Sequence, residues 1–249
     1  MALTVLQIAQ RVSGNAGIRP IDDLLDKNSK DALRLRDDLE LLGNDLVRKN
    51  NPYGGGWTVL TKEYRFTTVA GQQNYALPED CDRVIDGTVW PLDRYYKARG
   101  NLSVQEWGWV RSSIIGSGSI SPFYRIRGEG GTRKFSIYPE PVGNREFIFE
   151  YVSNGWLLGS DGRFKDRITA NDDIPILPQN LIIKGLRWRY RDTVGLSSPN
   201  DIHLSDYEMT LDDEISSDAG ERPLHLTRRR RVTNILTNFP ENIDAVGSG

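Results

Sequence analysis

The sequence predicts an α+β protein in which an antiparallel helical bundle, built from N- and C-terminal segments, carries an inserted antiparallel β-sheet or sandwich domain. Three observations lead to this fold class. In segments 4–49 and 178–217, apolar residues recur every three or four positions, which is the spacing of amphipathic helices. Between these segments, apolar and polar residues alternate in several short runs, as in half-buried strands. Beyond Gly220 neither period persists, which predicts an extended C-terminal arm.

Two helices are expected at the N-terminal end. The first runs from Thr4 to Val12, with Thr4 as its N-cap. The second runs from Ser29 to Lys49, and we expect its apolar stripe to be a packing face within its own domain, because it lasts only about two heptads. The stripe consists of Ala32, Leu35, Leu39, Leu42 and Leu46, widened by Leu33 and Leu41. The loop NNPYGGG at 50–56 ends the helical part.

The period changes to two after Trp57. Tyr64, Phe66 and Thr68 alternate with polar residues, and AGQQ then leads into NYALP, which predicts a hairpin. Ser103 and Glu106 have the spacing of a capping box, which predicts an inserted helix from Val104 to about Ser113. Further strands are expected at Arg83–Trp90, Phe123–Arg127, Lys134–Tyr138 and Arg145–Val152, the last with Phe147, Phe149 and Tyr151 on one face.

Two more helices are expected near the C-terminal end, one beginning at Pro178 and one from about Asp201 to Ser217. These elements divide the chain into three parts. Residues 1–56 and 172–219 form the helical bundle domain, 57–171 the inserted β domain with a short helix, and 220–249 the extended arm.

Composition limits the class of protein. The chain has 249 residues, 38% of them hydrophobic, and a mean hydropathy of −0.50, as in a globular protein with a core of its own. No apolar run is long enough to span a membrane, and residues 1–12 do not resemble a secretion signal. Cys81 is the only cysteine, so no intrachain disulfide is possible. The formal net charge of −2 gives no global attraction to nucleic acid or to a membrane.

No catalytic, cofactor or metal site is expected. His203 and His225 lack partners at metal-ligand spacing. The segment GEGGTRK at 128–134 is interpreted as a hairpin turn, because it lacks the ending of a phosphate loop and lies between two strands. Cys81 is expected to be a small buried residue. The acidic groups Asp172–Asp173 and Asp212–Glu214 are expected in a polar loop and on a solvated helix face.

Two basic segments leave alternatives open. In KGLRWRYR at 184–191, aromatic residues interleave with arginines as on some single-strand binding surfaces, but Trp188 fits equally well in the core beside arginine stems. The run Arg228, Arg229, Arg230 and Arg231 could be a solvated charge run, a docking element for an acidic protein surface, or a contact to nucleic acid.

An ordered set of short motifs resembles a known family. The set begins with FTTVAGQQNYALPEDCDRVIDGTVW at 66–90 and continues with LSVQEWGWV, SPFYRIRGEG, FSIYPEPV, FEYVSNGW and NDDIPILPQNLIIKGLRWRYR, followed by a helix with Tyr207. In this order the motifs resemble the head-to-tail adaptor proteins of short-tailed tailed bacteriophages, also described as tail tubular or head-completion proteins. The arginine-rich end of the chain matches no motif of that family.

The resemblance implies a virion structural protein made in the host bacterial cytoplasm and located at the head-tail interface. It implies a homo-oligomeric ring, generally of twelve subunits, that docks under the portal protein ring and continues the DNA channel. Genomic double-stranded DNA would pass through the lumen without specific binding, and tail nozzle or fibre proteins would attach below. The helical part would face the portal and make most subunit contacts, and the sheet domain would point toward the tail. The resemblance implies no catalytic residue, no cofactor and no membrane partner.

Within the arm, the residues expected to dock on the portal or on a neighbouring subunit are the four arginines together with apolar anchors. The anchors are Leu224, Leu226, Ile235, Leu236 and Phe239. Two other functions are kept as alternatives. One is a freestanding β-domain binding module, for example for glycans, with Trp107, Trp109 and Trp156 exposed in one patch. The other is a tail-associated hydrolase that uses Asp172 or Asp173.

Overall fold

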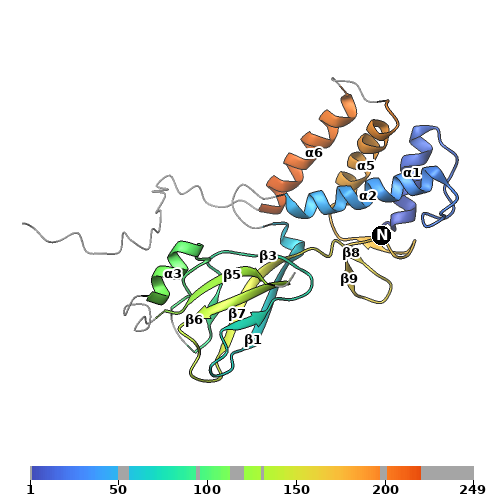
Figure 1. Ribbon diagram of the computed structural model, residues 1–249. Coiled ribbons are helices and arrows are strands. Elements are labelled where there is room, and N and C mark those ends of the chain that lie inside the picture. Colours follow the sequence, from blue (N-terminus) through green and yellow to red (C-terminus); the bar gives the residue numbers. More distant parts are fainter. Residues whose placement is uncertain are drawn as a thin grey trace, which may run out of the picture. The chain divides into compact units, whose positions relative to one another are not determined.

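The chain combines α-helices with antiparallel sheets, which confirms the predicted α+β class (Figure 1). The computed structural model describes residues 2–49, 56–93, 96–112, 121–129, 132–196 and 201–219. All of its elements belong to one compact unit, Met1–Ala219, and Gly220–Gly249 form a second unit. The predicted arm at 220–249 and most of the predicted loop at 50–56 therefore lie outside the described residues.

Five α-helices lie in the described part of the chain, and three of them begin at side-chain caps. Thr4 and Gln7 form a capping box, in which the Thr4 hydroxyl accepts from the Gln7 amide and the Gln7 side chain accepts from the Thr4 amide. The Ser29 hydroxyl accepts from the Ala32 amide, and Ser103 and Glu106 form the predicted capping box. The helices are α1 (Val5–Ala16), α2 (Lys30–Arg48), α3 (Val104–Ser112), α5 (Gln179–Thr193) and α6 (Ile202–Ala219).

The strands form three small sheets. In the first, β7 (Glu146–Ser153) pairs with β1 (Thr61–Thr67) on one side and with β3 (Cys81–Val84) and β4 (Trp90–Pro91) on the other. In the second, β6 (Thr132–Tyr138) pairs with β2 (Asn74–Ala76) and β5 (Phe123–Glu129). The third sheet is made of β8 (Leu157–Leu158), β9 (Phe164–Lys165) and β10 (Ile174–Pro175). A short 3-10 helix, η1 (Thr58–Leu60), precedes β1.

The predicted hairpin between Tyr64 and NYALP is wrong. β1 pairs with β7, whereas β2 pairs with β6, so the turn between them carries the chain from one sheet to another. All seven residues of β1 find partners on β7, and the three-residue β2 could not have supplied them. Gly71 turns the chain at φ 76°, and the Tyr75 hydroxyl donates to the Gln72 carbonyl at 2.7 Å and fixes this corner.

Two further sequence predictions need correction. The single strand predicted at 83–90 is two short strands, β3 and β4, separated by a turn at Gly87 (φ 82°), and both pair with β7. Leu41, expected to widen the apolar stripe of α2, is 55% exposed. The five central residues of that stripe, Ala32, Leu35, Leu39, Leu42 and Leu46, are fully buried, as predicted.

The sandwich core is rich in aromatic rings from β1, β2, β5, β6 and β7. Phe147, Phe149 and Tyr151 all point inward, as predicted. The Phe135 ring stacks on Phe149 with centroids 5.4 Å apart, and it stacks on Tyr124 at 5.2 Å. Figure 1 shows α3 beside β5 and β6, where the Arg125 guanidinium lies 4.9 Å from the Trp107 ring centroid.

The second core is helical and draws on both ends of the chain. α5 packs against α1, α2 and α6, and Figure 1 shows these four helices grouped together. A β-carbon on Gly185 of α5 would lie 2.8 Å from both Leu42 and Tyr207, so a glycine is needed where the three helices approach. Buried residues from outside the α-helices join this core, namely Ile21, Leu24, Trp57, Leu60, Val152, Trp156, Leu157, Ile168 and Leu177.

Two tryptophans connect this core to the strands. Trp57 lies just before η1 and β1 and donates its indole N–H to the Leu46 carbonyl of α2 at 2.8 Å. Trp156, just after β7, is fully buried, and a β-carbon on Gly43 would come within 2.2 Å of its ring. Because Thr61 of β1 pairs with Val152 of β7, the two chain segments enter the helical core side by side. We call Trp57, Trp156 and Gly43 the tryptophan seat.

We expect Gly43→Ala to lower the free energy of unfolding by about 2–3 kcal/mol, because the added methyl group overlaps the Trp156 ring. This loss outweighs the gain of up to about 1 kcal/mol that alanine brings to a helix interior. Gly14→Ala in α1 is the matched control, because nothing lies within 4 Å of its added carbon, and we expect it to be neutral or stabilising. Urea denaturation of both variants measures the effect. Equal stability of the two variants would show that the seat is not tightly packed.

Candidate functional site

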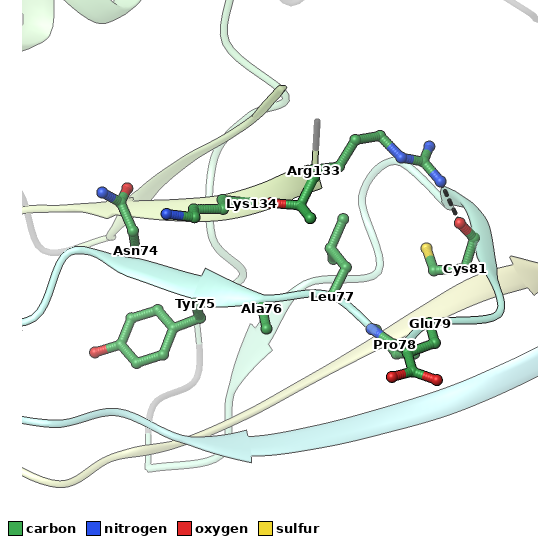
Figure 2. A pocket seen from close by; sticks show the side chains of 10 residues that line it. Asn74, Tyr75, Ala76, Leu77, Pro78, Glu79, Cys81, Arg133 and Lys134 are labelled. Carbon is green, nitrogen blue, oxygen red and sulfur yellow. Dashed lines mark hydrogen bonds between the residues drawn. The ribbon is translucent and has the colours of Figure 1, made fainter. Parts of the chain in front are cut away.

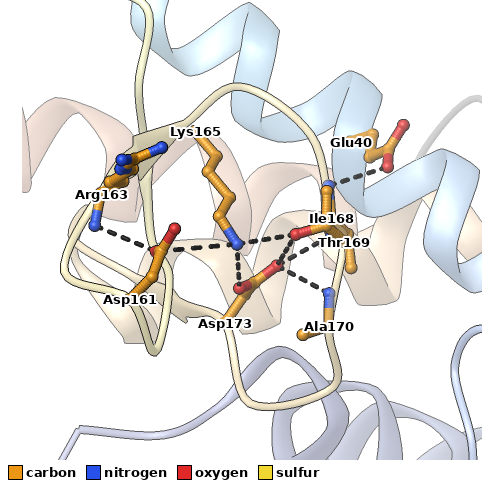
Figure 3. Close-up of polar contacts among 8 residues, drawn as sticks. All are labelled: Glu40, Asp161, Arg163, Lys165, Ile168, Thr169, Ala170 and Asp173. Carbon is orange, nitrogen blue, oxygen red and sulfur yellow. Dashed lines mark hydrogen bonds and ion pairs between the residues drawn. The ribbon is translucent and has the colours of Figure 1, made fainter.

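The most densely connected polar group is the Asp173 carboxylate, at the end of the connection from β9 to β10 (Figure 3). Its side chain is fully buried. Oδ2 accepts hydrogen bonds from the Thr169 amide at 2.8 Å, the Ala170 amide at 3.0 Å and the Thr169 hydroxyl at 3.3 Å. Oδ1 accepts from Lys165 Nζ at 3.3 Å. The carboxylate thus binds the backbone and side chains of the loop that precedes it.

These contacts decide the charge state of Asp173. Burial by itself would raise the pKa of the carboxyl, but the amides of Thr169 and Ala170 and the Lys165 ammonium favour the ionised form. The net result is that the pKa of Asp173 lies below its ordinary value of 3.8. A carboxyl held ionised, buried and fully engaged cannot serve as the general acid of a hydrolase.

The same loop is fastened to the helices by backbone contacts. The Val5 amide at the start of α1 donates to the Asp173 carbonyl at 2.9 Å, and the Ile168 amide donates to Glu40 of α2 at 3.0 Å (Figure 3). The Asn171 side chain bridges Asp23 at 2.8 Å and the Leu24 amide at 3.1 Å. Asp173 therefore lies in a polar loop, as predicted, but its burial and its role as a structural hub were not predicted.

A pocket of about 400 Å³ lies between β2, the turn that follows it, and β6 (Figure 2). Arg133 of β6 closes one end by donating to the carbonyls of Cys81 and Asp82. Cys81 is 4% exposed, as predicted, and burial raises the pKa of its thiol to about 11. The thiol is therefore protonated at neutral pH and is a poor nucleophile.

The three tryptophans proposed for a glycan-binding patch do not form one. Trp156 is fully buried in the helical core, and Trp107, a residue of α3, is 4% exposed. Trp109 alone of the three reaches the surface, with 38% of its area exposed. A binding module that stacks sugars on this trio is therefore not supported.

The basic segment at 184–191 is part of the helical packing. The Trp188 ring stacks on Tyr207 of α6 with centroids 5.7 Å apart. Lys184 donates to Asp206 and Thr210 of α6, both at 2.8 Å, and Arg189 pairs with Asp45 of α2. These contacts agree with the structural interpretation of this segment rather than with a single-strand binding surface.

Several predicted features lie wholly or partly beyond the described residues. The docking residues Arg228–Arg231, Leu224, Leu226, Ile235, Leu236 and Phe239 all fall there. β5 and β6 pair up to Glu129 and Thr132, as the predicted turn at 128–134 requires. In the described ranges, no cluster of His, Cys, Asp or Glu side chains could hold a metal ion. Nor does any helix in them have the length and apolarity to cross a membrane.

The buried polar groups described above hold loops and helices together. The family described as SU10 adaptor protein matches residues 4–232, and the chain belongs to this family. It is therefore a bacteriophage adaptor protein, a component of the virion, as the motif resemblance indicates. The family indicates a structural, non-enzymatic role. A comparison with individually curated proteins finds no match.

We expect Asp173→Asn to lower the free energy of unfolding by about 3 kcal/mol at neutral pH, because the amide cannot replace a buried acceptor of four hydrogen bonds. The exposed neighbour Asp172, which has no contact in the described residues, provides the control, and Asp172→Asn should change stability by less than about 0.5 kcal/mol.

The pH dependence of this difference tests the ionised state. Because folding lowers the pKa of Asp173, its contribution is fully present above the unfolded pKa of about 4 and is lost as pH falls toward the folded value. The stability gap between the natural chain and Asp173→Asn should therefore shrink between about pH 5 and pH 2. A gap that stays constant over this range in chemical denaturation would contradict the assignment.

Proposed function

We propose that the chain is one subunit of a homo-oligomeric ring, generally of twelve copies, that docks below the portal and continues the DNA channel toward the tail. The ring also provides the platform for tail nozzle or fibre proteins. The observation that carries this proposal is the match to the adaptor family over residues 4–232. DNA passes through the lumen without specific binding, in keeping with a net charge of −2.

We further propose that the parts of the chain divide this work. The helices of 1–56 and 172–219 form an antiparallel bundle that faces the portal and makes most subunit contacts, and the β domain of 57–171 points toward the tail. The two separate hydrophobic cores support such a division. Residues at its border, such as Trp57 and Trp156, belong to the helical core, so the two parts share a packed junction rather than a linker.

The segment 220–249 is proposed as a docking arm. Thirty residues can span at most about 100 Å when extended, well beyond one subunit. Its arginine run, Arg228–Arg231, would meet acidic groups on the portal or on an adjacent adaptor, an attraction that weakens with salt. Its apolar anchors would hold once seated in a groove. A solvated charge run would have no such effect, and a contact to DNA would not require the portal.

Truncation after Ala219 tests the arm. We expect the truncated chain to keep the melting temperature of the full chain, because its two cores lie within residues 1–219. We also expect it to lose co-sedimentation with purified portal rings. Lost folding, or docking that is as strong as before, would contradict the proposed arm. Native mass spectrometry of the free chain should find a monomer or weak oligomers, with ring closure only on the portal.

A further inference from the structure

One sheet edge of the β domain is open along a whole strand. β1 pairs with β7 over all seven residues, from Thr61 opposite Val152 to Thr67 opposite Glu146. On its other side, none of the described residues forms a backbone hydrogen bond with it. A strand with one unpaired side is a template for another strand.

The register identifies the unpaired groups. The Thr68 amide donates to the Arg145 carbonyl at 2.7 Å, so Phe66, Tyr64 and Lys62 are the β1 residues that bond β7. The residues between them, Glu63, Arg65 and Thr67, aim their backbone N–H and C=O groups at the open side. All three are exposed.

Other edges in the same domain are protected. The outer side of β5 is covered by residues 99–102, where Arg99 bridges Phe123, the Leu102 amide donates to the Tyr124 carbonyl, and the Asn101 side chain accepts from the Ile126 amide. β3 is broken by a register shift. β1 has neither a cover, nor a bulge, nor a proline, and its charged pair Glu63–Arg65 points to the outer face.

The inner face of β1 is only partly covered. Tyr64 and Phe66 are only partly buried, although both pack against the sandwich core. The Phe66 ring centroid lies 5.0 Å from Tyr75 and 5.6 Å from Phe135. An added strand would cover these two rings with its own inward side chains.

The chain leaves the helical core close to this edge. Asp218, one residue before the end of α6, accepts from the Thr58 amide at 2.8 Å and from the Thr58 hydroxyl at 2.5 Å. Thr58 is three residues from the start of β1. The end of α6, the last described element, is therefore held close to the start of the open strand.

Residues 220–249 contain one segment with the composition of a strand. Residues 232–239 read VTNILTNF, with no charge and no proline before Pro240. In an extended conformation, Thr233, Ile235, Thr237 and Phe239 share one face. The segment is eight residues long, matching the seven of β1.

We propose that residues 232–239 of one copy add as a strand to the open β1 edge of the next copy, an inference that rests on the proposed ring. Donor segment and acceptor edge are then different parts of the chain, so the contact is heterologous, the type of interface that generates a ring when its rotation closes. Residues 220–231 can span about 40 Å, and four adjacent arginines favour an extended chain. Backbone hydrogen bonds supply affinity, and Ile235 and Phe239 cover Tyr64 and Phe66.

A proline substitution in β1 tests the strand addition without disturbing the fold of the chain. The Arg65 amide is unbonded, so Arg65→Pro should leave the melting temperature within about 2 °C of the natural chain. The same change one residue earlier, Tyr64→Pro, removes an amide that donates to β7 and should lower the melting temperature. Arg65→Pro should reduce the hydrogen-exchange protection of residues 232–239 to that of a peptide with the same sequence. We expect this result both for the free chain at high concentration and for the chain on portal rings.

Cysteine pairing identifies the donor copy. One set of copies carries Arg65→Cys, and a second set, of different mass, carries a cysteine at one position from 233 to 238. The two sets are mixed, both as free chains and on portal rings, and are then oxidised. Cys81 is buried and does not interfere. Linked dimers should form at alternate positions, Asn234, Leu236 and Asn238, and not with Ser205→Cys, an exposed control on α6.

Three outcomes would overturn the strand addition, and a fourth would overturn only the proposed function. Dimers without alternation indicate random contact, and an internal link in a chain carrying both Arg65→Cys and Leu236→Cys indicates self-pairing. Rings that bind the portal without any link at Arg65 refute this contact alone. Chains that never bind the portal refute the proposed function, while alternate links in concentrated free chain would still support the strand addition.

Discussion

The packing of two tryptophans under α2 is the constraint on which the rest of the fold depends. Trp57 lies just before β1 and Trp156 just after β7, and both are buried in the helical core. Trp57 bonds the backbone of α2, and Trp156 fills space that only a glycine at position 43 leaves open. Thr61, four residues after Trp57, pairs with Val152, four residues before Trp156. The pairing of β1 with β7 therefore begins at a fixed point next to the helices. The sandwich is thus joined to the helices by packing and by two chain crossings.

The Asp173 loop makes a second connection of a different kind. Here a buried charge is satisfied almost entirely by its own loop, and the loop's backbone then bonds α1 and α2. Burial of an ionised group is tolerated only when its hydrogen bonds are complete. Such polar links hold the loop in a fixed arrangement against α1 and α2.

Much of this architecture could be predicted from local patterns. Cap signals at Thr4 and Ser103 placed two helix starts, and the spacing from Ala32 to Leu46 identified a buried helix face, because these signals act within one or two turns. Strand partners could not be predicted in the same way. The period-two pattern of β1 and the turn after it fit a hairpin, but partner choice depends on β7, some eighty residues away. Leu41 is apolar yet exposed, and Asp173 is charged yet buried, because burial depends on tertiary neighbours that no local pattern names.

For the functional surfaces, the ordered motifs pointed to an adaptor, and the family match agrees with them. The open edge of β1 could not be read from the sequence, because an edge is defined by which strands fail to pair. This edge is the acceptor surface that we propose for residues 232–239. The seat, the loop and the edge all lie within Met1–Ala219.

The central claim is that helices and sandwich are stabilised together through the tryptophan seat. Native-state hydrogen exchange of Trp156→Ala tests it, with peptides that cover α2 and peptides that cover β7. Removing the ring should lower the free energy of opening of both elements by similar amounts, about 3–5 kcal/mol. A loss confined to α2, with β7 as protected as in the natural chain, would contradict the claim and show that the two cores are independent.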